Sequence, residues 1–136
     1  MIALDTNLLV RLYVDDGDPQ SVRQRAAALR ICHDSKRLFV PKTVLLEFEW
    51  VLRGFYKFDR ASIARALAHL LGLPNINVES ENVALEALAH YQKGFDFADA
   101  LHLASSSDCD KLLSFDKRFV SRAARLKTSP VVEAAK

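Results

Sequence analysis

The chain has 136 residues, of which 50% are hydrophobic and 26% are charged, and its net charge is only +2. This composition is typical of a soluble globular domain, so we expect residues 1–136 to form a single domain. No apolar run is long enough for a membrane span, and we expect neither a membrane segment nor a signal peptide. Cys32 and Cys109 fit no CxxC pattern, and two free thiols are consistent with a cytoplasmic protein.

Short apolar runs alternate with longer amphipathic segments along the chain. In the first half we expect a strand at about 2–5, a helix through Tyr13, a helix from Asp18-Pro19 to about Asp34, a strand at 38–40, a helix capped by Thr43 that ends at Gly54, and a helix at about 59–71. In the second half we expect a strand at 76–78, a helix at 80–93, a helix capped by Asp96 that runs to about Ser106, a strand at 112–115, a helix at 117–126 and a weak strand at 131–132. This alternation predicts an α/β fold with a mostly parallel sheet.

Two of the expected strands run directly into an acid. The opening strand leads into Asp5, and the strand at 112–115 leads into Asp116. In open parallel sheets ligands bind outside the carboxyl ends of the strands, so acids placed there point into a prospective site. Each of the two acids has an alternative interpretation as a turn residue or as the cap of the helix that follows it.

Glu47 occupies an unusual place for a carboxylate. An apolar stripe runs along the helix after Thr43, from Val44 to Leu52, and Glu47 falls at its margin. Glu49 has an ordinary explanation, because it lies four residues before Arg53 on the opposite face and can pair with it. Glu47 either leans outward into water, with or without a local basic partner, or needs a partner within the protein, since an unpaired buried charge is costly.

Asp99 lies in a segment that is apolar on nearly every face. Asp96 is expected to cap this helix, which places Asp99 in the first turn. The backbone N–H groups and the dipole of a helix favour an anion there and help to keep the carboxylate ionised. Capping explains Asp96 fully, but it explains Asp99 less well, because Asp99 sits amid His102 and Leu103.

The acids of four separated elements need cations if they come together, because like charges in one site raise each other's pKa. These acids are Asp5, Glu47, Asp99 and Asp116. Mg²⁺ and Mn²⁺ prefer carboxylate oxygens and need few protein ligands, so either ion fits this set. The four histidines and two cysteines form no zinc-binding pattern.

The segment 117–127 contains five basic residues and no acid. Such a run is either a solvated helix face or a surface that holds phosphates. If it holds RNA, the residues that do so are Lys117, Arg118, Arg122 and Arg125.

Four segments resemble, in order, the four motifs of the PIN-domain family, and most closely those of the VapC toxins of toxin–antitoxin pairs. They are Asp5–Arg11, Leu45–Arg53, Phe97–Ala104 and Ser114–Phe119. Each motif alone is weak, but all four in this order cover nearly the whole chain. The resemblance implies a three-layer α/β/α fold around a central, mostly parallel sheet of four to five short strands.

The resemblance also implies an activity, that of an Mg²⁺- or Mn²⁺-dependent endoribonuclease that cleaves RNA with metal-activated water. It assigns Asp5, Glu47, Asp99 and Asp116 as catalytic metal ligands, Asp96 as an auxiliary acid, and Thr6, Asn7 and Ser114 as residues that orient the carboxylates. The fourth acid of the family is often less critical than the first three. The implied partners are a cognate VapB-like antitoxin, a second copy of the chain in a homodimer, and a tRNA, rRNA or mRNA substrate.

Other classes fit less well. A phosphatase of the haloacid-dehalogenase type needs Asp-x-Asp where this chain has Asp5-Thr6-Asn7, and a receiver domain needs an acid where the strand at 38–40 meets Pro41. No glycine-rich nucleotide-binding pattern is present. The alternative that stays open is a catalytically silent PIN-like module that binds RNA or protein.

Overall fold

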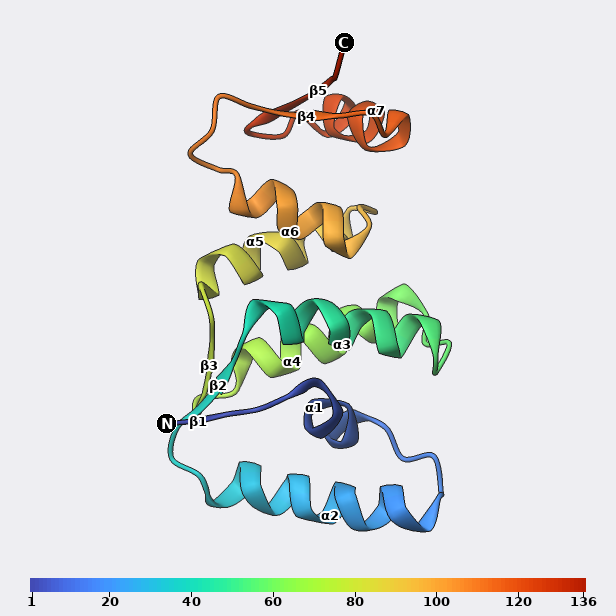
Figure 1. Ribbon diagram of the computed structural model, residues 1–136, viewed down its shortest axis with the longest axis vertical. Coiled ribbons are helices and arrows are strands. Elements are labelled where there is room, and N and C mark those ends of the chain that lie inside the picture. Colours follow the sequence, from blue (N-terminus) through green and yellow to red (C-terminus); the bar gives the residue numbers. More distant parts are fainter. The chain divides into compact units, whose positions relative to one another are not determined.

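The computed structural model describes residues 1–136 and contains seven helices and five short strands (Figure 1). Every strand pair is parallel, so the predicted α/β fold with a parallel arrangement is confirmed. The strands are hydrogen-bonded as a group of three and a group of two. The chain divides into two compact units, Met1–Glu81 and Asn82–Lys136. The single domain over 1–136 stays a prediction. None of the helices is both long enough and apolar enough to cross a membrane.

The first unit contains a three-stranded sheet and four helices. Its elements are β1 (Ile2–Ala3), α1 (Thr6–Tyr13), α2 (Pro19–Asp34), β2 (Leu38–Val40), α3 (Lys42–Gly54), α4 (Arg60–Gly72) and β3 (Ile76–Val78). The strand order is β1-β2-β3, so β2 is central, and its Leu38 and Val40 are fully buried. Helix α1 packs against both α2 and α3, and α3 packs against α4. This packing places the start of α1 beside the middle of α3.

The second unit contains three helices and a two-stranded sheet. Its elements are α5 (Glu81–Gln92), α6 (Phe97–Ser105), β4 (Lys111–Ser114), α7 (Lys117–Leu126) and β5 (Val131–Ala134). Strands β4 and β5 pair in parallel, and α7, which connects them, packs on both. Aromatic contacts hold the helices together, with ring centroids 5.3 Å apart for Tyr91–Phe97 and 6.0 Å apart for Phe95–Phe119.

The helix starts follow the predicted caps with one exception. The predicted caps Asp18 and Asp96 accept hydrogen bonds from backbone N–H groups in the first turns of α2 and α6. Asp59, for which no cap was predicted, does the same for α4. Thr43 was expected to cap α3, and that prediction is wrong, because the helix already begins at Lys42. The N–H of Lys42 donates to the Glu79 carboxylate at 3.1 Å, so a side chain from beyond β3 satisfies this helix start.

Candidate active site

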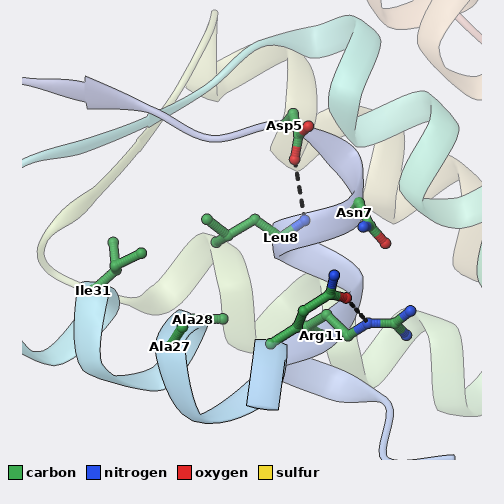
Figure 2. Close-up of a pocket in the computed structure, with 8 residues that line it drawn as sticks. Asp5, Asn7, Leu8, Arg11, Ala27, Ala28 and Ile31 are labelled. Atoms are coloured by element: carbon green, nitrogen blue, oxygen red, sulfur yellow. Dashed lines mark hydrogen bonds between the residues drawn. The ribbon is translucent and has the colours of Figure 1, made fainter. Parts of the chain in front are cut away.

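Asp5 is the N-cap of α1. Its backbone is extended, and its Oδ1 accepts a hydrogen bond from the N–H of Leu8 at 3.1 Å (Figure 2). The first strand therefore ends at Ala3, earlier than expected, because Asp5 already belongs to the helix start. The side chain stays exposed, and it lines two clefts of the first unit. Capping engages only Oδ1 of this exposed carboxylate, so the two interpretations of Asp5 are compatible.

Glu47 meets the start of α1 through Thr6. The Thr6 hydroxyl, which is buried, donates a hydrogen bond to the Glu47 carboxylate. Asp5, Thr6, Asn7 and Glu47 line a cleft of about 390 Å³ whose apolar walls come from Val10, Val44 and Val51. The structure thus brings two predicted metal ligands, Asp5 and Glu47, to one cleft. The predicted orienting residues Thr6 and Asn7 line the same cleft, and of these Thr6 bonds Glu47.

The buried acid of α3 is Glu49, not Glu47. The buried face of α3 consists of Leu45, Phe48, Glu49 and Leu52, spaced as one stripe of a helix. Glu49 is only 2% exposed, so the prediction that it lies on the opposite face is wrong. Its predicted pairing with Arg53 is confirmed, since the Arg53 Nε donates to Glu49 Oε2 at 2.9 Å. Glu47 is exposed, as one of its two interpretations required, and it also has a partner within the protein in Thr6, as the other required.

Three of the predicted site acids belong to the second unit. Asp96 caps α6, and its Oδ2 accepts from the N–H groups of Ala98 and Asp99 at 3.1 and 3.4 Å. Asp116 caps α7, and its Oδ1 accepts hydrogen bonds from the backbone N–H groups of Arg118 and Phe119 at 3.0 and 3.2 Å. Asp99 lies in the first turn of α6 and is half-buried.

Ser114, the third predicted orienting residue, acts on the backbone of Asp116. Its Oγ accepts a hydrogen bond from the Asp116 N–H at 3.0 Å. Ser114 therefore fixes where the chain leaves β4, and it positions the Asp116 carboxylate only indirectly.

The pKa of the Asp99 carboxyl is raised above its ordinary value. Burial is the main cause, and the negative charges of Asp96 and Asp116 add to it, while His102 and Arg122 oppose the shift. Burial and the two neighbouring carboxylates thus disfavour the ionised form of Asp99. The stabilising contribution of the helix start to that form stays a prediction. Asp96, Asp99 and Asp116 thus form one interacting acidic group within the second unit.

We predict that this raised pKa makes the ionised Asp99 unfavourable for the fold. Because the folded protein holds the Asp99 proton more tightly than the unfolded chain does, its contribution to stability is full below the ordinary pKa of 3.8 and is lost as the pH rises through the raised value. The unfolding temperature of the wild type should therefore fall relative to that of Asp99→Asn between acidic and neutral pH, in EDTA. The exposed Asp108→Asn variant should show no such trend, and a gap that shrinks with rising pH would contradict the prediction.

The donor set suits a hard cation. Within each unit the candidate ligands are carboxylates, accompanied by hydroxyl and amide groups, which are the donors that Mg²⁺ and Mn²⁺ prefer. Neither unit contains a group of three or more acidic, histidine or cysteine side chains that is placed to bind a metal ion. Asp5 and Glu47 belong to one unit and Asp96, Asp99 and Asp116 to the other, so a metal shared by all of them stays a prediction.

The basic residues of α7 share one surface. Lys117, Arg118, Arg122 and Arg125 line a cleft of about 420 Å³ together with Ser121. The helix buries Phe119 and Ala123 on its other face. Arg122 also lies close to Gly94, where a Cβ would stand 3.7 Å from its Nε, and it is near enough to Asp99 to lower that carboxyl's pKa. The basic surface therefore begins beside the acidic group of the second unit.

A second cleft beside Asp5 involves residues that no sequence motif singles out as a group. Arg11 Nε donates to Gln24 Oε1 at 2.9 Å, and this contact joins α1 to α2 at the edge of a cleft of about 240 Å³ (Figure 2). The two residues are thirteen positions apart on different helices. Only the packing of α1 on α2 could reveal them.

The comparisons with known proteins support one family. The model of the PIN domain matches residues 2–126, which contain all five candidate acids. No curated protein matches the sequence. Members of the matched family are generally metal-dependent nucleases. Since the match covers more than nine-tenths of the chain and runs through both compact units, the chain belongs to the PIN-domain family.

Proposed function

We propose that this PIN-domain protein is the toxin of a VapBC-type toxin–antitoxin pair, an endoribonuclease that depends on Mg²⁺ or Mn²⁺. The observation that carries the proposal is the cleft shared by Asp5 and Glu47, with the Thr6 hydroxyl bonded to the Glu47 carboxylate. The hydroxyl of Thr6, the residue after Asp5, fixes the Glu47 carboxylate at the cleft that Asp5 also lines, which is how residues around a metal ligand orient it. The four motifs of the sequence single out the same residues, and the family match spans all of them.

The residues of the chain have distinct parts in this proposal. Asp5, Glu47, Asp99 and Asp116 hold the cation, with Asp96 as an auxiliary acid, and Thr6, Asn7 and Ser114 keep these groups in place. A divalent cation supplies charge neutralisation at the phosphate and makes water a stronger nucleophile at neutral pH. Attack by water leaves a 5′ phosphate and a 3′ hydroxyl. Products with a 2′,3′-cyclic phosphate would contradict the proposal, because they require the ribose hydroxyl as the nucleophile.

The test is cleavage of a mixed pool of tRNA, rRNA and mRNA by the purified protein with Mg²⁺ or Mn²⁺ and with EDTA. We expect discrete fragments with 5′ phosphates in the presence of metal and no cleavage in EDTA. Cleavage that continues in EDTA would overturn the metal dependence. Sequencing of the fragment ends identifies the class of RNA that is cut.

The toxin role has its own test. Induced expression of the wild type in a bacterial host is expected to stop growth, and co-expression of the neighbouring antitoxin gene is expected to restore it. A cytoplasmic location, a homodimer and an antitoxin that covers the acidic cleft are part of the same proposal. If growth is unaffected while the purified protein cleaves RNA, the nuclease assignment stands and the toxin assignment is wrong.

We predict that the basic surface of α7 holds the RNA backbone. Arg118→Ala combined with Arg125→Ala should lower the slope of log affinity against log salt by about 1.4, because each phosphate contact to a single strand contributes about 0.7. The double variant Arg23→Ala/Arg30→Ala removes the same charge from exposed positions on α2 and serves as the control. Binding of an uncleavable RNA at several salt concentrations measures the slope for each double variant. If the two slopes are equal, the basic surface of α7 is only a solvated helix face.

One observation favours the second candidate, a silent module that binds RNA or protein. Asp5, Asp96 and Asp116 all cap helices, so three of the five acids have a structural reason to be present. Titration with Mg²⁺ or Mn²⁺ separates the two candidates. A metal-dependent rise in unfolding temperature that Glu47→Gln removes supports the enzyme, whereas no rise in the wild type supports the silent module.

A further inference from the structure

The cleft between α1 and α2 adjoins the candidate metal cleft. It encloses about 240 Å³ and shares Asp5 and Asn7 with the cleft that contains Glu47. A ligand that reaches from one cleft to the other must pass these two residues. The volume lies just below the range of about 300–1,000 Å³ typical of pockets for whole small molecules. It therefore suits a compact planar group rather than a long segment of chain.

One side of this cleft is apolar. Leu8 of α1 and Ile31 of α2 flank it, and Ala27 and Ala28 stand where larger side chains of α2 would fill the space (Figure 2). Ala28 is almost fully buried, while Ala27 is half-buried and faces the opening. Apolar walls of this kind can pack against the face of an aromatic ring.

The other side presents hydrogen-bond donors in fixed positions. Arg11 donates through Nε to Gln24 at 2.9 Å and through Nη1 to the Tyr56 hydroxyl at 3.0 Å, and Asp16 lies 3.9 Å away. Only 15% of the Arg11 side chain is exposed. Both residues line the cleft, and these bonds leave Arg11 Nη2 and Gln24 Nε2 as donors that none of them uses. The guanidinium is therefore held in place before any ligand arrives.

We propose that this cleft binds one base of the RNA substrate and so contributes to the choice of cleavage site. The inference rests on the proposed nuclease function and adds a base-specific subsite to it. Because the free groups of Arg11 and Gln24 are donors, they match bases that offer a carbonyl oxygen as acceptor, which guanine, uracil and cytosine do and adenine does not. Asp5 and Asn7 line both clefts, so the bound base belongs to a nucleotide next to the cleaved phosphate.

The test compares Ala27→Leu with Ala26→Leu. The first substitution fills the cleft without removing a polar group, whereas the second places the same side chain one residue away at an exposed position. Each protein is titrated with GMP, UMP, AMP and CMP by calorimetry in EDTA, so that binding is measured without cleavage. The cut sites of each protein in a random RNA pool are then sequenced in the presence of Mn²⁺.

We expect the wild type and Ala26→Leu to bind GMP or UMP at least about fivefold more tightly than AMP, as a base-reading contact implies. Ala27→Leu should lose that preference and should cut RNA with a flatter base pattern around the scissile bond. Equal binding of all four nucleotides by the wild type would overturn the proposal, and so would an unchanged preference in Ala27→Leu. Base-selective binding without RNA cleavage would support the subsite and contradict the nuclease.

Gln24→Glu provides a second test, which does not depend on how well Ala27→Leu packs. Glutamate has nearly the same shape and keeps an acceptor for Arg11 Nε, but it replaces the free donor with an acceptor. We expect the order of preference among the four nucleotides to change. A uniform weakening of all four would reflect charge alone and would count against base reading by Gln24.

Discussion

RNA cleavage by the Asp99→Asn variant is expected to fall at least about 100-fold, with no loss of stability. Asparagine keeps the shape of the side chain but removes the charge that a divalent cation needs. Even residues that only support metal ligands contribute about 10–100-fold to activity, so a ligand should contribute more. The fold should tolerate the change, because the ionised Asp99 is already disfavoured by burial and by Asp96 and Asp116. Initial rates on a defined RNA, together with thermal unfolding, measure both effects.

Asp108→Asn is the matched control for this experiment. Asp108 is an exposed acid in the turn after α6, outside the candidate site, and the substitution removes the same charge. It should retain wild-type activity. If Asp99→Asn cleaves RNA at a rate within a few-fold of the wild-type rate, Asp99 is not a catalytic metal ligand, whatever the result for the other acids.

The two glutamates of α3 are expected to respond in opposite ways to the same substitution. Glu47→Gln should lower RNA cleavage at least about 100-fold and leave stability nearly unchanged, because Glu47 is exposed and faces the candidate metal cleft. Glu49→Gln should destabilise the fold by about 1–3 kcal/mol, because Glu49 is buried and bonded to Arg53. The surviving folded Glu49→Gln protein should cleave RNA at the wild-type rate.

Urea unfolding at a temperature where both variants are folded measures the two stabilities, and initial rates under the same conditions measure cleavage. The pair is informative because the residues stand two positions apart on one helix and carry the same functional group. If Glu49→Gln lost cleavage while stability held, the assignment of Glu47 as the metal ligand would be wrong for this helix.

Much of the fold follows from local signals in the sequence. Asp18 before Pro19 is a strong helix start, and Asp96 is an N-cap that α6 uses. Short apolar runs such as Leu38–Val40 are central strands, since the residues of a strand covered on both faces must all be apolar. In each of these cases one or two neighbouring residues determine the local structure, so the prediction does not depend on distant contacts.

The phase of α3 could not be predicted in the same way. The helix has apolar residues on several faces, and a stripe through Val44 and Val51 is nearly as plausible as the one through Leu45 and Leu52. Packing against α1 and α4 selects the second stripe, and it buries Glu49 with it. Glu79 acts similarly at the start of α3, where a contact across 37 positions replaces the expected local cap.

The site was predictable as a set of acids but not in its detailed contacts. The sequence motifs single out Asp5 and Glu47, and the structure places both at one cleft. The raised pKa of Asp99 depends on burial and on two carboxylates from different helix starts, which local propensities do not describe. The contact of Arg11 with Gln24 likewise exists only because α1 lies on α2.

Capping by three of the site acids affects how inactive relatives of this protein can be recognised. A relative that has lost nuclease activity still needs its helices to begin at Asp5, Asp96 and Asp116, and aspartate serves that need as well as asparagine or serine does. Aspartate at these positions can therefore persist for folding alone, so its presence does not mark an active nuclease. The carboxylates of Glu47 and Asp99 cap no helix. These two residues are free to change once catalysis is lost. They are therefore the positions that distinguish an active nuclease from an inactive relative.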